Sequence, residues 1–388
     1  MPTSHSSSAA APARMPPATW MLVLCAAGAG ALQHHREIVG QMPGAPLLGW
    51  VSLDEGEAQR RGAVCMDGST PGFYYKAAAV EDAKTKWIVN FLDGSWCATE
   101  DECDKRMDTR LSTKGSLPER NMDVSAAMED PFVNFNQVLI WYCDGGVFAG
   151  NRTEPLITRS GKTVYLRGRR ILELVIDTLK EERFGMSAAT EVLLTGGSAG
   201  GWATFMHADY VRERLPASIT KLRAAPMSAW WAHTPGWGMS GDFLPSMEVF
   251  RDLHGMHDIG PKRCREQEPK DQAWRCMFSD YSWAYSATPI FLLQVTDAFV
   301  AGENVTLART SQVNSKCALH FLDPEICERE TVTKINSLVG GLVQHLQSVA
   351  STSSPGRGSR GAFISSCNEH TFYHTSGFTG FSIGGVTP

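Results

Sequence analysis

A serine flanked by glycines is the clearest chemical feature of the sequence. Gly196-Gly-Ser-Ala-Gly200 matches the pattern G-x-S-x-G and lies between a strand-like run, 191–195, and a predicted helix, 202–215. In a strand–turn–helix elbow the glycines permit a tight turn that lifts the serine hydroxyl above a sheet. We therefore predict Ser198 as a nucleophile and the backbone N–H of Ala199 as a donor to an oxyanion. The alternative is a glycine-rich turn that only packs a helix against a strand.

A nucleophilic serine needs a general base and an acid that orients the base. Asp297 directly follows the predicted strand 289–295, and His370 lies shortly after the last predicted strand. The chain order Ser, Asp, His is the order found in α/β-hydrolases. Ser198, Asp297 and His370 are therefore the predicted catalytic triad. Asp323 and His374 are the nearest rivals for the acid and the base.

A second loop supplies further candidates for the oxyanion hole. Asp93-Gly-Ser-Trp-Cys97 follows the predicted strand 86–92 and contains the glycine that such a loop requires. In α/β-hydrolases a second donor comes from a loop after an earlier strand. We predict the backbone N–H groups of Ser95 and Trp96 as these donors. An ordinary turn held by a disulfide at Cys97 is the alternative.

Apolar strand-like runs alternate with helical patterns along the chain, and no repeat or long linker interrupts them. Such alternation predicts an α/β fold of the α/β-hydrolase type, with a mostly parallel sheet flanked by helices on both faces and disulfide-stapled loop insertions. Residues 49–388 are predicted to form a single domain, because no boundary is visible. The predicted elements are the strands 86–92, 137–142, 191–195, 289–295 and 361–365, a strand-like run at 222–228, and the helices 169–182, 202–215 and 332–350.

The composition is that of a globular protein. Of the 388 residues, 43% are hydrophobic and 20% are charged, and the formal net charge is -5. Nucleic-acid binders and membrane-surface binders need a basic face, so we expect neither a nucleic-acid partner nor a stable membrane partner. Residues 1–31 carry Arg14, a short apolar run and several small residues, which together predict a secretory signal peptide. An uncleaved anchor and a disordered leader are the alternatives.

The cysteine pattern agrees with secretion. Ten cysteines are present, and nine remain when Cys25 of the leader is set aside. Short loops between cysteines are easily closed in an oxidising compartment. An odd number predicts at least one thiol that is free or paired between chains. No spacing is typical of a metal site, and we expect neither a metal nor a cofactor. The predicted pairs are Cys97 with Cys103, Cys264 with Cys276 and Cys317 with Cys327, and the predicted glycosylation sites are Asn151 and Asn304.

Taken together, these motifs resemble the pectin acetylesterase and Notum family of secreted carboxylesterases. The blocks that carry the resemblance run in order: FLDGSWC (91–97), WYCDGGVFAG (141–150), YLRGRRI (165–171), GGSAGGWATF (196–205), TPIFLLQVTDAF (288–299) and FISSCNEH (363–370). The resemblance covers residues 49–388 and implies an α/β-hydrolase-like fold without a metal. The triad positions match Ser198, Asp297 and His370.

The elbow sequence is closer to the plant-type pectin acetylesterase branch than to Notum. The resemblance therefore implies a serine carboxylesterase that hydrolyses O-acetyl esters of a pectin-like polysaccharide outside the cell or in a cell wall. Two alternatives stay open: a Notum-like enzyme that removes a fatty acyl group from a protein, and a catalytically inactive hydrolase fold that serves as a binding module.

Tryptophans near the predicted elbow allow two interpretations. Trp230, Trp231 and Trp237 follow a strand-like run and could stack on sugar rings, but packing in a core or lid is the more common role of such residues. Trp202, just after the elbow, either narrows an acyl pocket or points into the core.

Overall fold

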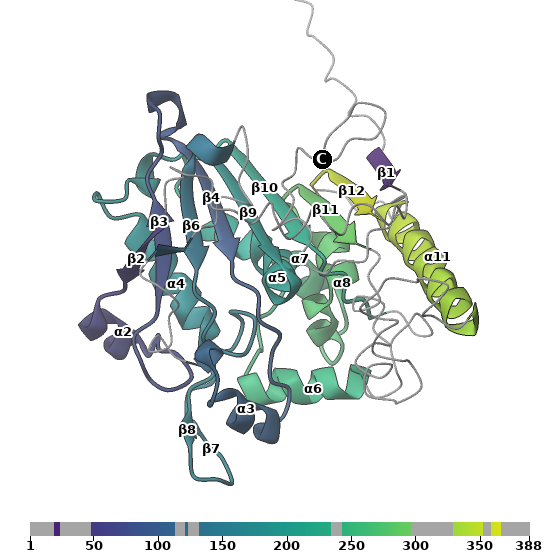
Figure 1. Cartoon of the computed structure of the whole chain (residues 1–388), viewed down its shortest axis with the longest axis horizontal. Coiled ribbons are helices and arrows are strands. Elements are labelled where there is room, and N and C mark those ends of the chain that lie inside the picture. The colour runs from purple at the N-terminus through teal and green to yellow at the C-terminus, as the bar shows by residue number, and fades with distance from the viewer. Residues whose placement is uncertain are drawn as a thin grey trace, which may run out of the picture.

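The computed structural model of the chain describes residues 19–23, 48–112, 121–122, 132–233, 243–295, 329–351 and 358–365. A ten-stranded sheet runs through this part of the chain, in the order β1-β12-β11-β10-β9-β4-β6-β3-β2-β5 (Figure 1). From β1 to β6 in this order, neighbouring strands are parallel, and the remaining pairs are antiparallel. The predicted α/β-hydrolase-like class with a mostly parallel sheet is confirmed.

The strands of this sheet are β1 Thr19–Val23, β2 Leu48–Ser52, β3 Gly72–Lys76, β4 Lys86–Phe91, β5 Asn121–Met122, β6 Asn136–Ile140, β9 Glu191–Gly197, β10 Lys221–Met227, β11 Ile290–Val295 and β12 Arg360–Ser365. Two short strands, β7 Leu156–Ile157 and β8 Thr163–Val164, form a separate hairpin. The α-helices are α2 Glu55–Arg61, α3 Glu100–Arg106, α4 Gly168–Leu179, α5 Ser198–Arg214, α6 Phe243–His254, α7 Lys262–Gln267, α8 Ser279–Tyr285 and α11 Arg329–Ser351. Single 3₁₀ turns lie at η1 Glu81–Ala83, η2 Arg110–Ser112, η4 Phe132–Asn134, η5 Met186–Ala188 and η6 Ala273–Met277.

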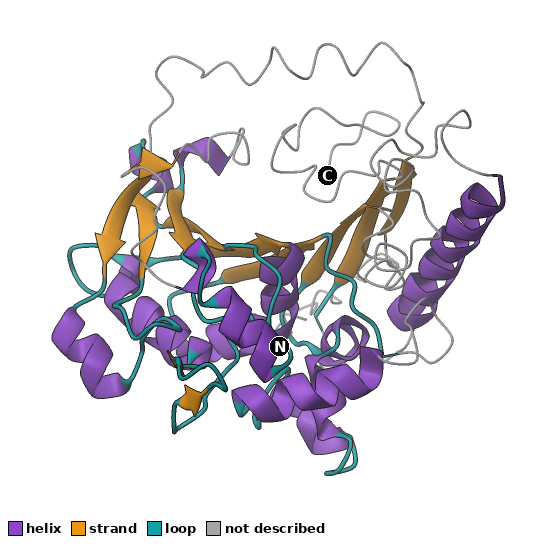
Figure 2. Ribbon diagram, turned by 60° about the horizontal axis from the view of Figure 1, so that its bottom comes forward, coloured by secondary structure: helices purple, strands orange, loops and turns teal. Residues whose placement is uncertain are grey.

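The central helix α5 packs directly on the middle of the sheet, against β4, β9 and β10. Figure 2 shows most of the described helices on one face of the sheet. The sequence analysis predicted helices on both faces of the sheet. The helices that lie together on this one face do not form the predicted second layer. The apolar stripe of α4 belongs to the core, since Ile171, Leu172, Val175 and Leu179 are all fully buried. Apolar burial of this extent is the main favourable term that holds the layers together.

Element boundaries differ from the predictions mainly at α5. The pattern predicted a helix from Trp202, whereas α5 begins at Ser198 itself. Gly200 and Gly201 have low intrinsic helix propensity, which hid the first turn from the sequence pattern. The register of the sheet and the close packing described below fix these glycines in the helix nevertheless.

Three disulfides join described segments that lie outside the strands. Cys97–Cys103 and Cys264–Cys276 are formed as predicted. Cys65–Cys143 joins residues 78 positions apart and was not predicted, because proximity in sequence gave no sign of it. Cys317 and Cys327 lie outside the described residues.

The edge strand β1 lies within the segment predicted as a secretory signal. It pairs in parallel with β12, from Thr19 beside Gly361 to Val23 beside Ser365. Cleavage after residue 31 would remove this strand. Within the described part of the chain, no helix is both long and apolar enough to cross a membrane.

Candidate active site

Ser198 stands at the junction between β9 and α5, as the elbow motif predicts. The strand ends at Gly197 and the helix begins at the next residue. The backbone of Ser198 has a φ of 50°, in the left-handed region that non-glycine residues seldom adopt. Such strain persists only where the surrounding structure enforces it, and it is typical of functional sites.

The glycines of the elbow are required by close backbone contacts. A Cβ on Gly200 would overlap the carbonyl oxygen of Phe91, the last residue of β4. A Cβ on Gly196 would lie 2.5 Å from the backbone of Gly200, and one on Gly201 would lie 2.6 Å from the carbonyl oxygen of Met227. Only hydrogen atoms fit at these positions, so the start of α5 can approach both neighbouring strands.

Ser198 also lies at the amino end of a helix of 17 residues. The first N–H groups of a helix have no partner within the helix and carry partial positive charge. The N–H of Ala199 belongs to this first turn and is suited to stabilise an oxyanion. The Ser198 residue is nearly buried, with 7% of its surface exposed.

The carboxyl ends of four parallel strands meet at the same edge of the sheet. Gly197 is paired with Met227, Met227 with Leu293, and Leu293 with Phe363. Ser198 follows the first of these strands. Asp297 and His370 follow β11 and β12 in the sequence but lie outside the described residues. The structure therefore fixes the position of the predicted nucleophile and of the strands that precede the predicted acid and base.

The loop after β4 leaves the sheet beside the elbow, since Phe91 pairs with Gly196. It contains Ser95 and Trp96, the predicted oxyanion donors. Ser95 has a φ of 56° and Gly94 a φ of 147°. Neither Ser95 nor Trp96 donates its backbone N–H to an acceptor among the residues that the structure describes. Within the described part of the chain, both groups thus remain available to a ligand oxygen.

Aromatic side chains support this loop from beneath. The Trp96 ring packs edge-on against Trp202 and Trp231, with centroid distances of 4.9 and 5.2 Å. Trp202 is fully buried, and its indole N–H donates to the carbonyl oxygen of Met277 at 2.7 Å. Trp202 therefore belongs to the core under the loop, which settles the two predicted roles in favour of packing.

Two of the three tryptophans that follow the strand-like run 222–228 also belong to the core. Trp230 and Trp231 are buried, so the packing role is confirmed for both, and Trp237 lies outside the described residues. His345 lies on α11 beside Trp230, with its Nε2 atom 3.8 Å from the carboxylate of Asp280. Asn151 is exposed, and its side-chain oxygen accepts from Nε of Arg170 at 2.8 Å. Asn304 lies outside the described residues.

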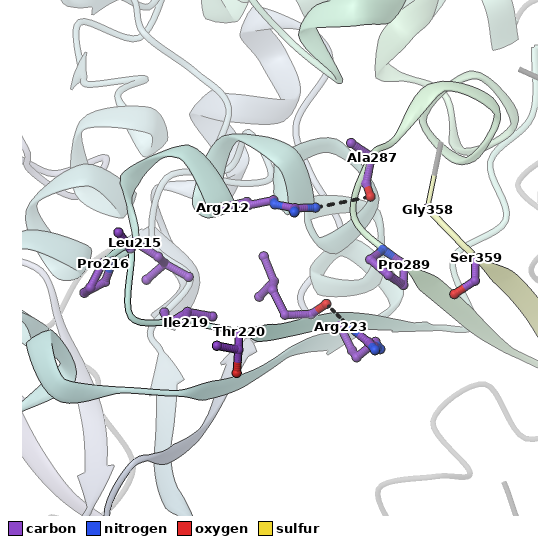
Figure 3. A pocket seen from close by; sticks show the side chains of 12 residues that line it. Arg212, Leu215, Pro216, Ile219, Thr220, Arg223, Ala287, Pro289, Gly358 and Ser359 are labelled. Carbon is purple, nitrogen blue, oxygen red and sulfur yellow. Dashed lines mark hydrogen bonds between the residues drawn. The ribbon is translucent and has the colours of Figure 1, made fainter. Parts of the chain in front are cut away.

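A cavity of about 440 Å³ lies at the opposite edge of the sheet (Figure 3). Thr220, Pro289 and Ser359 line it, and these residues directly precede β10, β11 and β12. Arg212 and Arg223 also line it. Because Ser198 follows the carboxyl end of its strand, this cavity is separate from the candidate active site.

Among the described residues, one group could be mistaken for a metal site. Cys97, Cys103 and His254 place their ligand atoms within 4.8 Å of one another. The two sulfur atoms are joined in a disulfide, and a metal ligand must be a free thiolate. The Nε2 atom of His254 is 2.8 Å from the carbonyl oxygen of Cys97, to which it donates. This histidine is a structural support of the loop.

Comparisons with known proteins identify the family of the chain. The sequence profile of the family described as pectinacetylesterase matches residues 55–381. The chain belongs to this family. The predicted family is thereby confirmed, and so is the enzyme class of carboxylic ester hydrolase.

The chain is similar in sequence to pectin acetylesterases and to palmitoleoyl-protein carboxylesterases. Pectin acetylesterase 5 of Arabidopsis thaliana is 27% identical over 321 residues, which cover 81% of this chain and 71% of the relative. Palmitoleoyl-protein carboxylesterase notum1 of Xenopus laevis is 27% identical over 266 residues, which cover 64% of this chain and 52% of the relative. The crystal structure of the Wnt deacylase Notum from Drosophila superposes with a TM-score of 0.68 at 22% identity, covering 88% of this chain and 90% of that one. This last similarity shows the fold.

In this member of the pectinacetylesterase family, a buried carboxylate supports the site, and sequence reasoning did not single it out. Asp144 is fully buried, and its Oδ2 atom accepts from the N–H groups of Gly146 and Phe148 at 3.0 and 3.1 Å. Burial raises the pKa of Asp144 to about 6, although these two hydrogen bonds and nearby Arg106 oppose the shift. In the sequence, the signal for this buried carboxylate was the aspartate of the block WYCDGG (141–146).

Two histidines around the same turn are buried and neutral. His207 on α5 donates from Nε2 to the carbonyl oxygen of Val147 at 3.2 Å, and burial lowers its pKa to about 3. Burial likewise lowers the pKa of His254 to about 4. Neither residue is placed to act as the general base, because both are fully buried and bonded to carbonyl groups.

The elbow glycines give a matched test of the close packing. Gly200→Ala should destabilise the fold by about 1–3 kcal/mol or more, because its methyl group would overlap a backbone carbonyl. Gly340 of α11 is the control, since no described atom lies within 4 Å of the position that an added methyl group would take. Gly340→Ala should stabilise the protein by up to about 1 kcal/mol through helix propensity. Urea unfolding of both variants measures the difference, and equal effects of the two substitutions would contradict the packing account.

Asp144 gives a prediction for pH. Its pKa is raised in the folded protein, so the native state binds more protons than the unfolded state between about pH 4 and 6, and stability falls as the pH rises through this window. Over that range, the free energy of unfolding of the wild type should fall by at most about 3 kcal/mol relative to that of Asp144→Asn, since each pKa unit corresponds to about 1.4 kcal/mol. The buried histidines act in the opposite direction but equally in both proteins. Parallel pH profiles of the free energy of unfolding for the two proteins would refute the assignment.

Proposed function

We propose that the chain is a secreted serine carboxylesterase that uses Ser198, Asp297 and His370 as a catalytic triad and hydrolyses O-acetyl esters of a pectin-like polysaccharide. The observation that carries the proposal is the position of Ser198, strained between a central parallel strand and the amino end of α5. Family membership supports the reaction class.

Strand register supports the choice of acid and base. Asp297 is two residues beyond the end of β11, and His370 is five residues beyond the end of β12. Adjacent strands lie about 4.8 Å apart, so β12 lies about 14 Å from β9 across the sheet. Five extended residues span up to about 17 Å. His370 is therefore within reach of Ser198, and Asp297 follows the strand between them.

The proposed reaction is acyl transfer through the serine. The hydroxyl oxygen of Ser198 attacks the ester carbonyl carbon while His370 accepts its proton, and Asp297 stabilises the resulting imidazolium. The N–H groups of Ala199, Ser95 and Trp96 stabilise the negatively charged oxygen. The proton passes to the leaving alcohol, and a water molecule then releases the acyl group by the same steps in a second round.

We propose that residues 49–388 form one enzyme domain and that residues 1–31 direct it to the secretory pathway. The disulfides among described residues support an oxidising compartment. Because Thr19–Val23 forms the edge strand beside β12, the N-terminus of the mature protein shows whether this strand is kept. Signal cleavage leaves β12 at the edge of the sheet.

Ser198→Ala should lower ester hydrolysis by more than about 10⁴-fold while leaving the fold intact, because the nucleophile is lost. A fluorophosphonate probe should label the wild type at Ser198 and leave the variant unlabelled. Ser228 is the matched control, since it lies at the neighbouring strand end with a φ of 48°. The Ser228→Ala variant should still be labelled at Ser198.

His370→Ala should be as damaging as loss of the nucleophile, whereas His374→Ala should retain most activity. Label found on a residue other than Ser198, or inactivity confined to His374→Ala, would reject the proposed triad. The rate should also fall toward acid pH, because a protonated imidazole cannot accept the serine proton.

Acyl length separates the two kinds of relative. An acetylesterase gains little from longer acyl chains, whereas a site that accommodates lipid gains about 0.8 kcal/mol for each buried CH₂, or roughly fourfold in binding. We expect kcat/KM for p-nitrophenyl esters to decline beyond butyrate. A steady rise from acetate to octanoate would instead support the fatty-acyl deacylase.

A further inference from the structure

The carbonyl groups of the proposed oxyanion loop are held by two side chains. The Tyr142 hydroxyl donates to the carbonyl oxygen of Ser95 at 2.7 Å. Nη1 of Arg106 donates to the carbonyl oxygen of Gly94 at 2.8 Å. These carbonyls belong to the peptide groups Gly94–Ser95 and Ser95–Trp96, whose N–H groups are those of Ser95 and Trp96.

Holding a carbonyl group fixes the N–H group of the same peptide. A trans peptide is planar, so its N–H points opposite to its C=O. The N–H groups of Ser95 and Trp96 consequently point away from Arg106 and Tyr142. No described residue accepts a hydrogen bond from either of them. The two side chains thus determine the direction in which two donors point that have no acceptor among the described residues.

The loop needs such support because its backbone is strained. Ser95 has a φ of 56°, a conformation that costs of order 1–3 kcal/mol for a non-glycine residue. Gly94 is enclosed, since a Cβ there would lie 2.9 Å from a methyl carbon of Leu111 and 3.0 Å from the Tyr142 ring. Without the two hydrogen bonds, the peptide groups could rotate toward more favourable conformations.

Tyr142 itself is fixed in one role. Its hydroxyl accepts from the N–H of Val147 at 3.1 Å, so its single proton is directed to the Ser95 carbonyl. The side chain is fully buried, and the Arg106 guanidinium lies 5.0 Å from the centre of its ring. Val147 has a φ of 49° in a turn whose neighbouring N–H groups are held by Asp144. A fixed chain of contacts therefore leads from the core to the loop.

We propose that Tyr142 and Arg106 are positioning residues that hold the N–H groups of Ser95 and Trp96 in the direction required to bind the oxyanion. The proposal rests on the proposed serine esterase function. It assigns to these two side chains a contribution to the transition state and not to substrate binding.

Tyr142→Phe tests the proposal because it removes one oxygen and keeps the ring. We expect kcat to fall by about 10- to 100-fold with KM changed less than about threefold, since loss of one oxyanion donor costs about 10²–10³-fold and a misdirected donor costs less. The second-order rate of fluorophosphonate labelling at Ser198 should fall in parallel, because that reaction also develops negative charge on oxygen.

Tyr75→Phe is the matched control. The Tyr75 hydroxyl donates to Oδ1 of Asn136 at 3.1 Å, a side-chain hydrogen bond on β3 far from the loop. This variant should lose stability but keep kcat. A kcat for Tyr142→Phe within about twofold of the wild type would overturn the proposal, as would equal losses of kcat in both variants.

Arg106→Lys provides an independent test should Tyr142→Phe fail to fold. Lysine keeps the charge but cannot retain the guanidinium geometry, so kcat should again fall while KM stays within about threefold. An unchanged kcat would overturn the proposal. Labelling of the wild type separates failure of the proposed function from failure of the positioning role. If Ser198 is not labelled, the proposed function fails. Normal labelling with an unaffected Tyr142→Phe variant rejects only the positioning role.

Discussion

Between the start of α5 and the end of β4 there is room for a hydrogen atom but not for a methyl group. The Phe91 carbonyl occupies the space that a side chain at position 200 would need. This contact sets the distance between the central helix and the sheet, and it places the end of β4 beside the elbow. The strained serine and the loop that follows Phe91 are adjacent for this reason. A displaced helix would separate the proposed nucleophile from two of its three proposed oxyanion donors.

The loop after β4 depends on contacts from distant parts of the chain. The disulfide Cys97–Cys103 joins the end of the loop to α3, and the N–H of Cys97 donates to the Gly145 carbonyl at 3.0 Å. Trp202 and Trp231 pack under Trp96. The segment 142–148 therefore acts as a scaffold between the core and the loop. Its buried carboxylate and its strained backbone are explained by this supporting role, and neither needs to contact a substrate.

Local patterns predicted much of this architecture. The elbow, the central strands and the loop of Ser95 and Trp96 follow from apolar periodicity and from glycines at fixed spacing, because those signals arise from contacts near in sequence. The first turn of α5 was missed, since two glycines that disfavour a helix are required there by packing against other strands. Tyr142 and Arg106 were not recognised for a related reason. Their partners are 47 and 12 residues away, and a single sequence gives no register for such contacts.

In the proposed mechanism, Ser198, Ala199 and the loop of Ser95 and Trp96 form one site for a developing oxyanion. The most direct measurement is a crystal structure of the chain after reaction with a fluorophosphonate, whose tetrahedral phosphorus mimics the intermediate. We predict phosphorus bonded to Oγ of Ser198, with the phosphoryl oxygen about 2.7–3.1 Å from the backbone nitrogen of Ala199 and from that of Ser95 or Trp96. A phosphonyl group on another residue, or an oxygen that contacts neither the helix nor the loop, would contradict it.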